Sequence, residues 1–175
     1  MREADGCRAW ALEEFGSAKL GDSRRTDRLV SIAGEAHRKP GGRVSDVFAS
    51  DAERQGAYDF LENGAVDASQ LGRAMAEATA QRAAELPFVT VAIDGSSLTL
   101  ANHKGTKNFG RIGSYRGKGK GSRGLKVISS LAMDGAGAPL GLVDQQWWVR
   151  VNDPKRGVAR GARKKERVKL SLIHI

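Results

Sequence analysis

The chain has 175 residues, which suits one ordinary domain or two small ones, and its 40% hydrophobic and 28% charged content is typical of globular proteins. The single cysteine, Cys7, excludes an internal disulfide and a zinc site built from cysteines. No apolar run approaches the roughly 20 residues of a membrane span, and the N-terminus lacks a signal-peptide core, so neither secretion nor membrane insertion is predicted.

The net charge of +9 is unevenly divided along the chain. Residues 1–87 carry 12 basic and 15 acidic residues, whereas residues 88–175 carry 17 basic and 5 acidic residues. A strongly basic half is typical of a protein that binds a polyanion, most often nucleic acid. The charge by itself identifies neither the fold nor the chemistry.

The first 87 residues have the pattern of a helical bundle. An amphipathic segment covers residues 10–15, and a longer helix is predicted to run from Asp22 to Arg38. Asp22 is expected to cap this helix, because its carboxylate can accept hydrogen bonds from the free amides of the first turn. Three apolar residues of the helix recur at helical spacing and are expected to face a core: Leu29, Ala33 and Ala36.

Two more helices are predicted before Pro87. Ser50 and Glu53 have the spacing of a capping box, at the start of a helix that ends at Asn63-Gly64. Asp67 opens the next helix, which is rich in alanine and is expected to continue to residue 86, where Pro87 stops it. Four helices in residues 1–87 predict a compact domain.

The hydrophobic pattern changes after Pro87. Residues 88–93 (FVTVAI) are almost continuously apolar and partly β-branched, which predicts a central strand buried on both faces. Residues 124–133 and 139–149 are predicted to form two more strands. The segment 134–137 between them has the composition of a hairpin turn.

The connector over residues 101–123 is rich in glycine and basic residues, and no acidic residue occurs between Gly95 and Met133. A charge run is usually a solvated loop, but a cationic glycine-rich connector is also suited to following a phosphate backbone. The basic residues in this region are Lys104, Lys107, Arg111, Arg116, Lys118, Lys120, Arg123 and Lys126. Residues 152–175 are also polar and basic, and we expect them to form a loose tail.

Asp94 directly follows the predicted central strand. A carboxylate is costly at the end of a buried strand unless it is hydrogen-bonded or coordinates a cation. One interpretation is that Asp94 caps a turn over Gly95-Ser96-Ser97. The other is that it is a metal ligand, because a hard oxygen donor on a rigid strand can place Mg²⁺ beside a phosphate. The local sequence leaves both interpretations open.

Three arginines follow Asp22 at the start of the predicted helix. Arg24 and Arg28 share a helix face, and Arg25 and Arg28 are neighbours at three residues' separation. With Asp22 and Asp27 nearby, a solvated, salt-bridged face is one interpretation. The other is a guanidinium cluster that contacts DNA phosphates or base edges, and the spacing does not choose between them.

Several segments together resemble DDE transposases of the insertion-sequence-four type, the group that includes the transposon-five transposase. They occur in the family's order and span most of residues 10–150. The segments are LGDSRRTDRLV (20–30), QGAYDFLEN (55–63), IDGSSLTL (93–100), FGRIG (109–113) and PLGLVDQQWWVR (139–150).

The resemblance implies an α+β chain. A helical domain over residues 1–87 would bind the double-stranded DNA of transposon ends, and residues 88–151 would form the first strands of a ribonuclease-H-like catalytic core. Asp94 matches the first Asp of the family's Asp-Asp-Glu triad, which binds two divalent ions, Mg²⁺ or Mn²⁺. The arginine cluster matches the basic cluster of the end-binding helix: Arg24, Arg25 and Arg28. A homodimer on DNA and a prokaryotic, cytoplasmic, nucleoid-associated location are also implied.

Two departures from the family pattern affect what we expect of this chain. Ile128 stands where the family usually has a histidine, and the family's second Asp and its Glu lie beyond residue 175. The ending SLIHI fits no family pattern, so the sequence after about Lys169 is expected to be artefactual. We therefore expect an N-terminal transposase fragment that binds transposon ends without cleaving them. The alternative is a non-enzymatic protein whose basic second half binds nucleic acid of any nucleotide sequence.

Overall fold

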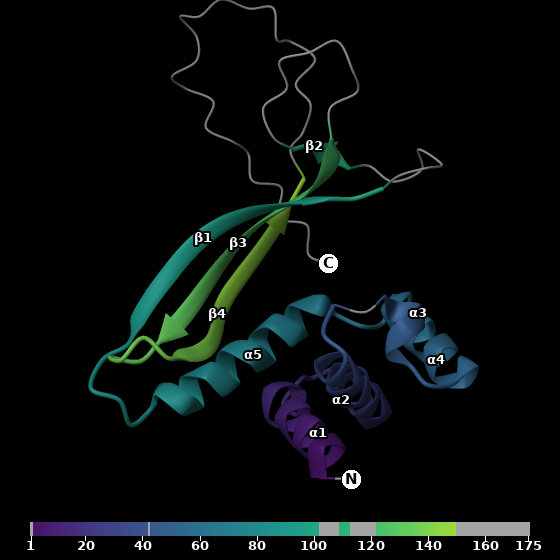
Figure 1. Ribbon diagram of the computed structural model, residues 1–175, viewed down its shortest axis with the longest axis horizontal. Coiled ribbons are helices and arrows are strands. Elements are labelled where there is room, and N and C mark those ends of the chain that lie inside the picture. Colours follow the sequence, from purple (N-terminus) through teal and green to yellow (C-terminus); the bar gives the residue numbers. More distant parts are fainter. Residues whose placement is uncertain (1, 42, 102–108, 113–121, 150–175) are drawn as a thin grey trace, which may run out of the picture. The chain divides into compact units, whose positions relative to one another are not determined.

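The computed structural model describes residues 2–41, 43–101, 109–112 and 122–149, and consists of helices followed by strands (Figure 1). The chain divides into two compact units. The first takes Met1–Val91 and Leu131–Asp144, and the second takes the rest of the described chain. In the described residues, no helix is both long and apolar enough to cross a membrane.

The helices all lie in the first unit, and the four that the sequence predicts are present. A fifth, α3, has four residues and was not predicted. The bounds are Arg2–Phe15 for α1, Ser23–Arg38 for α2, Val44–Val47 for α3, Asp51–Leu61 for α4 and Ala68–Ala83 for α5.

The predicted capping residues begin the helices. The Asp22 carboxylate accepts from the backbone N–H of Arg24 at 2.9 Å, and Ser50 and Glu53 form a reciprocal capping box at the start of α4. Asp67 caps α5 by accepting from the backbone N–H of Ser69. Helix α5 ends at Ala83, three residues before the predicted end. Ala84 keeps helical φ and ψ, and the backbone N–H of Leu86 then donates to the carbonyl oxygen of Ala83 in a turn before Pro87.

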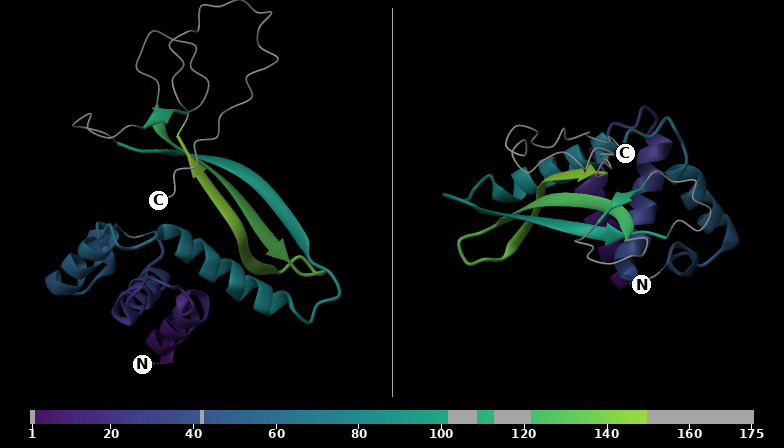
Figure 2. Two further views of the ribbon diagram at one scale, coloured as in Figure 1. Left: turned by 180° about the vertical axis from the view of Figure 1, so that it is seen from behind. Right: turned by 90° about the horizontal axis from the view of Figure 1, so that it is seen from above.

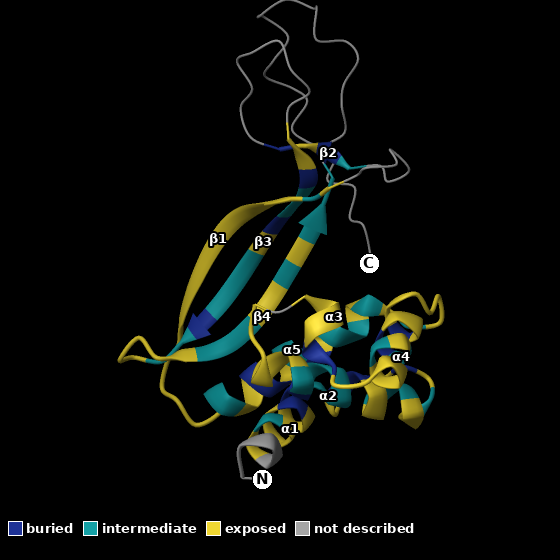
Figure 3. Cartoon of the chain, turned by 45° about the vertical axis from the view of Figure 1, so that its right-hand side comes forward, coloured by how far each residue is buried: buried dark blue, intermediate teal, exposed yellow. Residues whose placement is uncertain are grey.

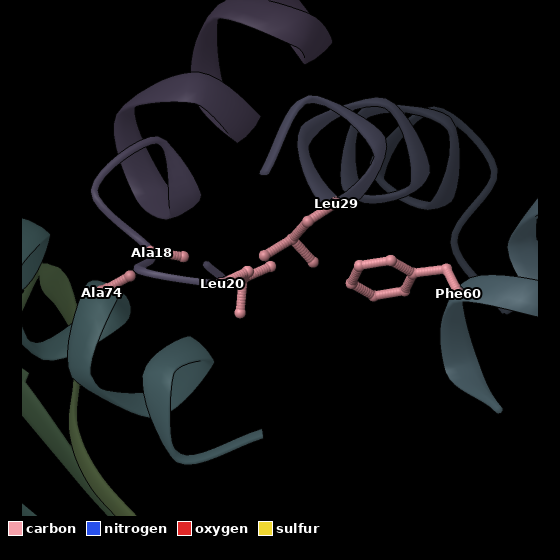
Figure 4. Packing of buried hydrophobic residues seen from close by; sticks show 5 residues of the cluster. All are labelled: Ala18, Leu20, Leu29, Phe60 and Ala74. Atoms are coloured by element: carbon pink, nitrogen blue, oxygen red, sulfur yellow. The ribbon is translucent and has the colours of Figure 1, made fainter. Parts of the chain in front are cut away.

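The core of the first unit lies among α2, α4, α5 and the turn before α2. Figure 4 shows Leu29 of α2 and Phe60 of α4 pointing toward one another near Leu20 of that turn. All three side chains are buried, and Ala18 and Ala74 complete the cluster. Burying large apolar side chains in this way is the main driving force for folding. A second cluster joins Val47, Phe48 and Ala57.

The buried face of α2 differs in part from the predicted one. Leu29 is buried as predicted, but Ala33 is half-buried and Ala36 is exposed. The reason is that α1 packs against Gly34, where a β-carbon would lie 3.4 Å from the Cα atom of Arg8. Ala36 follows Gly34 by two residues, about 200° around the helix, and therefore points away from that contact.

The sheet is built around β3 (Arg123–Met133), which pairs with β1 (Thr90–Thr99), β2 (Gly110–Arg111) and β4 (Pro139–Trp148). Strands β2 and β3 are antiparallel, with Gly110 opposite Gly124. Strands β1, β3 and β4 run side by side in the different views of Figures 1 and 2. The predicted hairpin turn between β3 and β4 is confirmed: the Asp134 carboxylate accepts from the backbone N–H groups of Ala136 and Ala138.

The prediction that β1 is a central strand buried on both faces is wrong. All ten of its residues are exposed, as the yellow ribbon of Figure 3 shows, and Ile93 is 70% exposed. In the described chain β1 pairs only with β3, so it is an edge strand. An apolar run is buried on both faces only where other layers cover it, and in the second unit the described elements are strands of the same sheet.

Helix α5 is attached to the β3–β4 hairpin inside the first unit. The Thr79 hydroxyl lies 2.9 Å from the carbonyl oxygen of Leu142, and the Arg82 Nε donates to the carbonyl oxygen of Leu140 at 2.6 Å. Arg82 also forms ion pairs with Glu13 and Glu14 of α1, at 2.9 and 2.8 Å. One guanidinium group therefore holds α1, α5 and β4 together.

Candidate nucleic-acid interface

The structure places the three predicted arginines on the first two turns of α2, but it gives each of them different surroundings. Arg24 is held by Asp22: its Nε lies 3.2 Å from both carboxylate oxygens and its Nη2 lies 2.7 Å from Oδ2. The Arg24 side chain is nevertheless 87% exposed. The side-chain hydrogen bond from Arg24, together with the one from its backbone, lowers the pKa of Asp22 to about 2. The pair is therefore fully charged at neutral pH.

Arg25 has a structural role. Its Nη1 donates to the carbonyl oxygen of Leu20 at 2.8 Å, and the side chain is half-buried. The neighbouring Thr26 hydroxyl donates to the carbonyl oxygen of Ala18 at 2.9 Å. These two bonds hold the turn between α1 and α2, in which Gly21 has a φ of 77°. Arg25 was predicted to contact DNA, but in the structure its guanidinium is bound to the carbonyl oxygen of Leu20 within the domain.

Arg28 is exposed and lies across α4 at Gly56. A β-carbon at Gly56 would be 3.0 Å from Nη1 and 3.1 Å from Cζ of Arg28, so a side chain there would require the guanidinium to shift by a few tenths of an ångström. Sequence reasoning missed Gly56 as a residue of this surface. A glycine inside a helix costs about 1 kcal/mol relative to alanine. Its presence within a predicted helix therefore indicates close packing at that position, and this signal could have identified Gly56.

Two of the predicted basic residues of the second half lie on paired strands. Arg111 of β2 is directly opposite Arg123 of β3, and both are exposed. The Arg123 Nη1 donates to the carbonyl oxygen of Phe109 at 2.9 Å, and among the described residues no carboxylate forms an ion pair with this guanidinium. Like charges directly opposite each other on neighbouring strands are unfavourable, and a bound anion would relieve the repulsion.

Lys126, the last basic residue of the second half that the structure describes, is engaged within the sheet. Its Nζ lies 2.9 Å from the Ser97 hydroxyl on β1. The remaining predicted DNA-binding residues lie outside the described residues, as does the predicted loose tail over residues 152–175: Lys104, Lys107, Arg116, Lys118 and Lys120.

Asp94 lies in the middle of β1 and is exposed, which corrects the expectation of a carboxylate on a buried strand. Residues 95–97 continue the strand, so the interpretation that Asp94 caps a turn there is wrong. The bonds from Leu100 to Arg123 and from Lys126 to Ser97 fix one register between β1 and β3, which places Asp94 opposite Ser129. The Ser129 hydroxyl in turn bonds to Nε2 of Gln145 at 3.0 Å.

The surroundings of Asp94 offer few further ligands for a cation. In the described part of the chain, no group of three His, Cys, Asp or Glu side chains could hold a metal ion. Ile128, which stands at the position of the usual family histidine, lies close to Gly95: a β-carbon there would be 3.8 Å from its Cγ1. Among the described residues, Ser129 thus lies opposite Asp94, whereas Ile128 lies beside Gly95, whose side of the strand faces the other way.

Comparison with known families gives one match within the helical part of the chain. Residues 7–66 match a family model described as transposase DNA-binding. The match includes most of α1, all of α2, α3 and α4, and the three arginines of α2, and it ends before the strands and Asp94. This segment of the chain is therefore similar to a transposase DNA-binding domain.

Proposed function

We propose that this chain binds the double-stranded ends of a DNA transposon through α1 to α4, as the N-terminal portion of a DDE transposase of the insertion-sequence-four type. The observation that carries the proposal is the coincidence of the family match with a folded helical unit. Within residues 7–66, α2 presents the exposed guanidinium groups of Arg24 and Arg28 on a shared face.

The chemistry of the α2 surface supports DNA as the ligand. An α-helix fits the major groove of DNA, and residues near the N-terminus of a recognition helix contact the base edges. Arginine is the side chain best suited to both base edges and phosphates, because its planar fork donates two parallel hydrogen bonds. Arg111 and Arg123 add a second cationic position, on the strands, that suits the phosphate backbone. We also propose that the protein binds DNA as a homodimer, because the resemblance to the transposase family implies one.

The proposal assigns residues 88–151 to the start of a ribonuclease-H-like core, with Asp94 as the first carboxylate of the triad. The pairing of β1, β2 and β4 with β3, which is antiparallel for β2, and the place of Asp94 on β1 support this assignment. A pair of Mg²⁺ or Mn²⁺ ions in such an enzyme activates the attacking hydroxyl and stabilises the leaving oxygen. Among the described residues, no three carboxylate, histidine or cysteine side chains come together as such a pair of ions requires, so these residues do not fit it, and the proposed function of this chain includes no cleavage step.

A selection experiment tests the proposed DNA binding. The full chain is incubated with a pool of duplexes that carry a randomised segment, and the bound duplexes are sequenced after several rounds. We expect one recurring sequence motif. Binding without a motif, with an affinity that falls steeply with salt, would support the alternative of a non-enzymatic, sequence-indifferent binding protein.

A nicking assay tests the assignment of Asp94. The selected duplex is incubated with the full chain and Mg²⁺ or Mn²⁺. We expect binding without nicking, and we expect Asp94→Ala to bind as tightly as the unmodified chain. Metal-dependent nicking that Asp94→Ala abolishes would contradict the expectation that this chain only binds DNA.

A further inference from the structure

We propose that Arg24 reads a guanine in the major groove, and that Asp22 is the positioning residue that orients its guanidinium. This inference rests on the proposed DNA binding and goes beyond it, because it gives separate roles to the three arginines of α2.

The Asp22 carboxylate holds Arg24 at both of its ends. Oδ1 accepts from the backbone N–H of Arg24 at 2.9 Å, which also caps α2, and the same carboxylate accepts from Nε and Nη2 of the side chain at 2.7 to 3.2 Å. A long arginine side chain on a surface normally loses rotamer entropy when it binds a ligand. Here the contacts with Asp22 already hold one edge of the guanidinium in the absence of DNA, although the side chain is 87% exposed.

The atoms that Asp22 uses leave the other edge of the guanidinium free. Arginine has five N–H donors, and Asp22 takes those along the edge formed by Nε and Nη2. The outer edge, formed by Nη1 and the second hydrogen of Nη2, still presents two parallel donors. Two parallel donors match O6 and N7 of guanine, which is the commonest base-specific contact of arginine in the major groove.

The acid at Asp22 favours a base edge over a phosphate as the partner of Arg24. A carboxylate beside a guanidinium cancels its charge and would repel a phosphate, whereas a base edge is neutral. Arg28 differs from Arg24 in its charge environment, because it is exposed and within the described chain it pairs with no acidic side chain. Arg28 therefore suits a phosphate, while Arg25 is committed to the carbonyl oxygen of Leu20.

The test uses the full chain, the duplex obtained by selection and a scrambled duplex of equal length. The central variant is Asp22→Asn, because asparagine caps a helix as well as aspartate but lacks the charge that orients Arg24. We expect the ratio of the two Kd values to fall on the order of tenfold. We also expect Asp22→Asn to bind the scrambled duplex more tightly, because a negative charge near the phosphates is removed.

Two further variants separate base reading from phosphate contact. Arg24→Lys keeps the charge but not the two parallel donors, so it should lose discrimination and keep its affinity for the scrambled duplex. Arg28→Ala should weaken binding to both duplexes equally and reduce the slope of log K against log salt by about 1. Circular dichroism of each variant checks that α2 is formed.

The outcomes distinguish this inference from the proposed function. If the unmodified chain selects no motif, both are overturned. A second outcome is that the chain selects a motif, while Asp22→Asn and Arg24→Lys discriminate between the selected and scrambled duplexes to the same degree as the unmodified chain. In that case the inference alone is overturned. Equal weakening of both duplexes by Asp22→Asn would mean that Asp22 acts only through the fold, and would also overturn the inference.

Discussion

A β-carbon on Gly141 of β4 would lie 2.3 Å from the hydroxyl oxygen of Thr79 on α5. The same hydroxyl lies 2.9 Å from the carbonyl oxygens of Met75 and Leu142. Gly141 also has a φ of 142°, which L-residues with side chains rarely adopt. The attachment of the hairpin to α5 therefore depends on the absence of a side chain at residue 141.

Gly141→Ala is predicted to destabilise the first unit by about 2 kcal/mol or more, because backbone strain and overpacking add at this position. Urea unfolding followed by circular dichroism measures the change in the free energy of unfolding. Gly137→Ala is the matched control: Gly137 has a φ of 85°, but nothing lies within 4 Å of its β-carbon position. Equal losses for the two variants would contradict the close packing against Thr79.

Arg82→Ala is predicted to cost about 3 kcal/mol in the free energy of unfolding, because it leaves the buried carboxylate of Glu14 and the carbonyl oxygen of Leu140 without their donor. Burial by itself lowers the pKa of Arg82, but the hydrogen bonds that Arg82 donates to Glu14 and Glu13 outweigh it and raise the pKa overall. The guanidinium therefore stays charged.

Arg54→Ala is the control for Arg82→Ala, because the ion pair between Arg54 and Asp51 joins a half-buried guanidinium to a largely exposed carboxylate. Pairs of this kind contribute at most about 1 kcal/mol. Denaturant unfolding of the two variants should therefore differ by about 2 kcal/mol or more. Similar losses would mean that Arg82 does not hold α1, α5 and β4 together.

Gly56→Ala is predicted to weaken DNA binding without destabilising the fold. Alanine is the better helix former by about 1 kcal/mol, but its methyl group would lie 3.0 Å from Nη1 of Arg28 and would push the guanidinium from its position on α4 by a few tenths of an ångström. Gly72→Ala on α5 is the control, since nothing lies within 4 Å of that β-carbon position. Fluorescence anisotropy with a labelled duplex should show weaker binding for Gly56→Ala alone, and unchanged binding would argue against a DNA contact by Arg28.

The stability of the first unit should depend on the ionisation of Asp22. Its pKa is lowered from 3.8 to about 2 by the hydrogen bonds of Arg24, so its contribution is complete above about pH 4 and is lost as the pH falls through 2. Asp22→Asn should lack this part of the pH dependence, while retaining the cap of α2. Thermal unfolding of the unmodified chain and of Asp22→Asn is measured between pH 2 and 6. If the unfolding temperatures of the two proteins changed in parallel with pH, the predicted contribution of Asp22 would be contradicted.

The beginnings of the helices could be predicted from the sequence because capping is local. Asp22, Ser50 and Asp67 each bond to an amide two or three residues away, so the short sequence patterns contain the whole interaction. The hairpin turn at Asp134 is local in the same sense. The positions of the arginines on α2 followed directly from helical spacing.

What the sequence could not predict depends on contacts between distant residues. The exposure of β1 and Asp94 depends on which elements cover the sheet, and an apolar run alone does not contain that information. The contact of Arg28 with Gly56 joins two helices, and that of Thr79 with Gly141 joins a helix to a strand. Spacing placed the three arginines on one helix, but their different surroundings depend on contacts with Asp22, Leu20 and Gly56.

The most direct test of the account compares two double variants of the full chain by anisotropy, on the selected duplex and on the scrambled one. The variants are Arg24→Ala/Arg28→Ala on α2 and Arg111→Ala/Arg123→Ala on the paired strands. We predict that the first loses most of the discrimination between the duplexes, while the second binds both more weakly and keeps the discrimination. Discrimination that survives the loss of Arg24 and Arg28 would contradict the assignment of DNA recognition to α2.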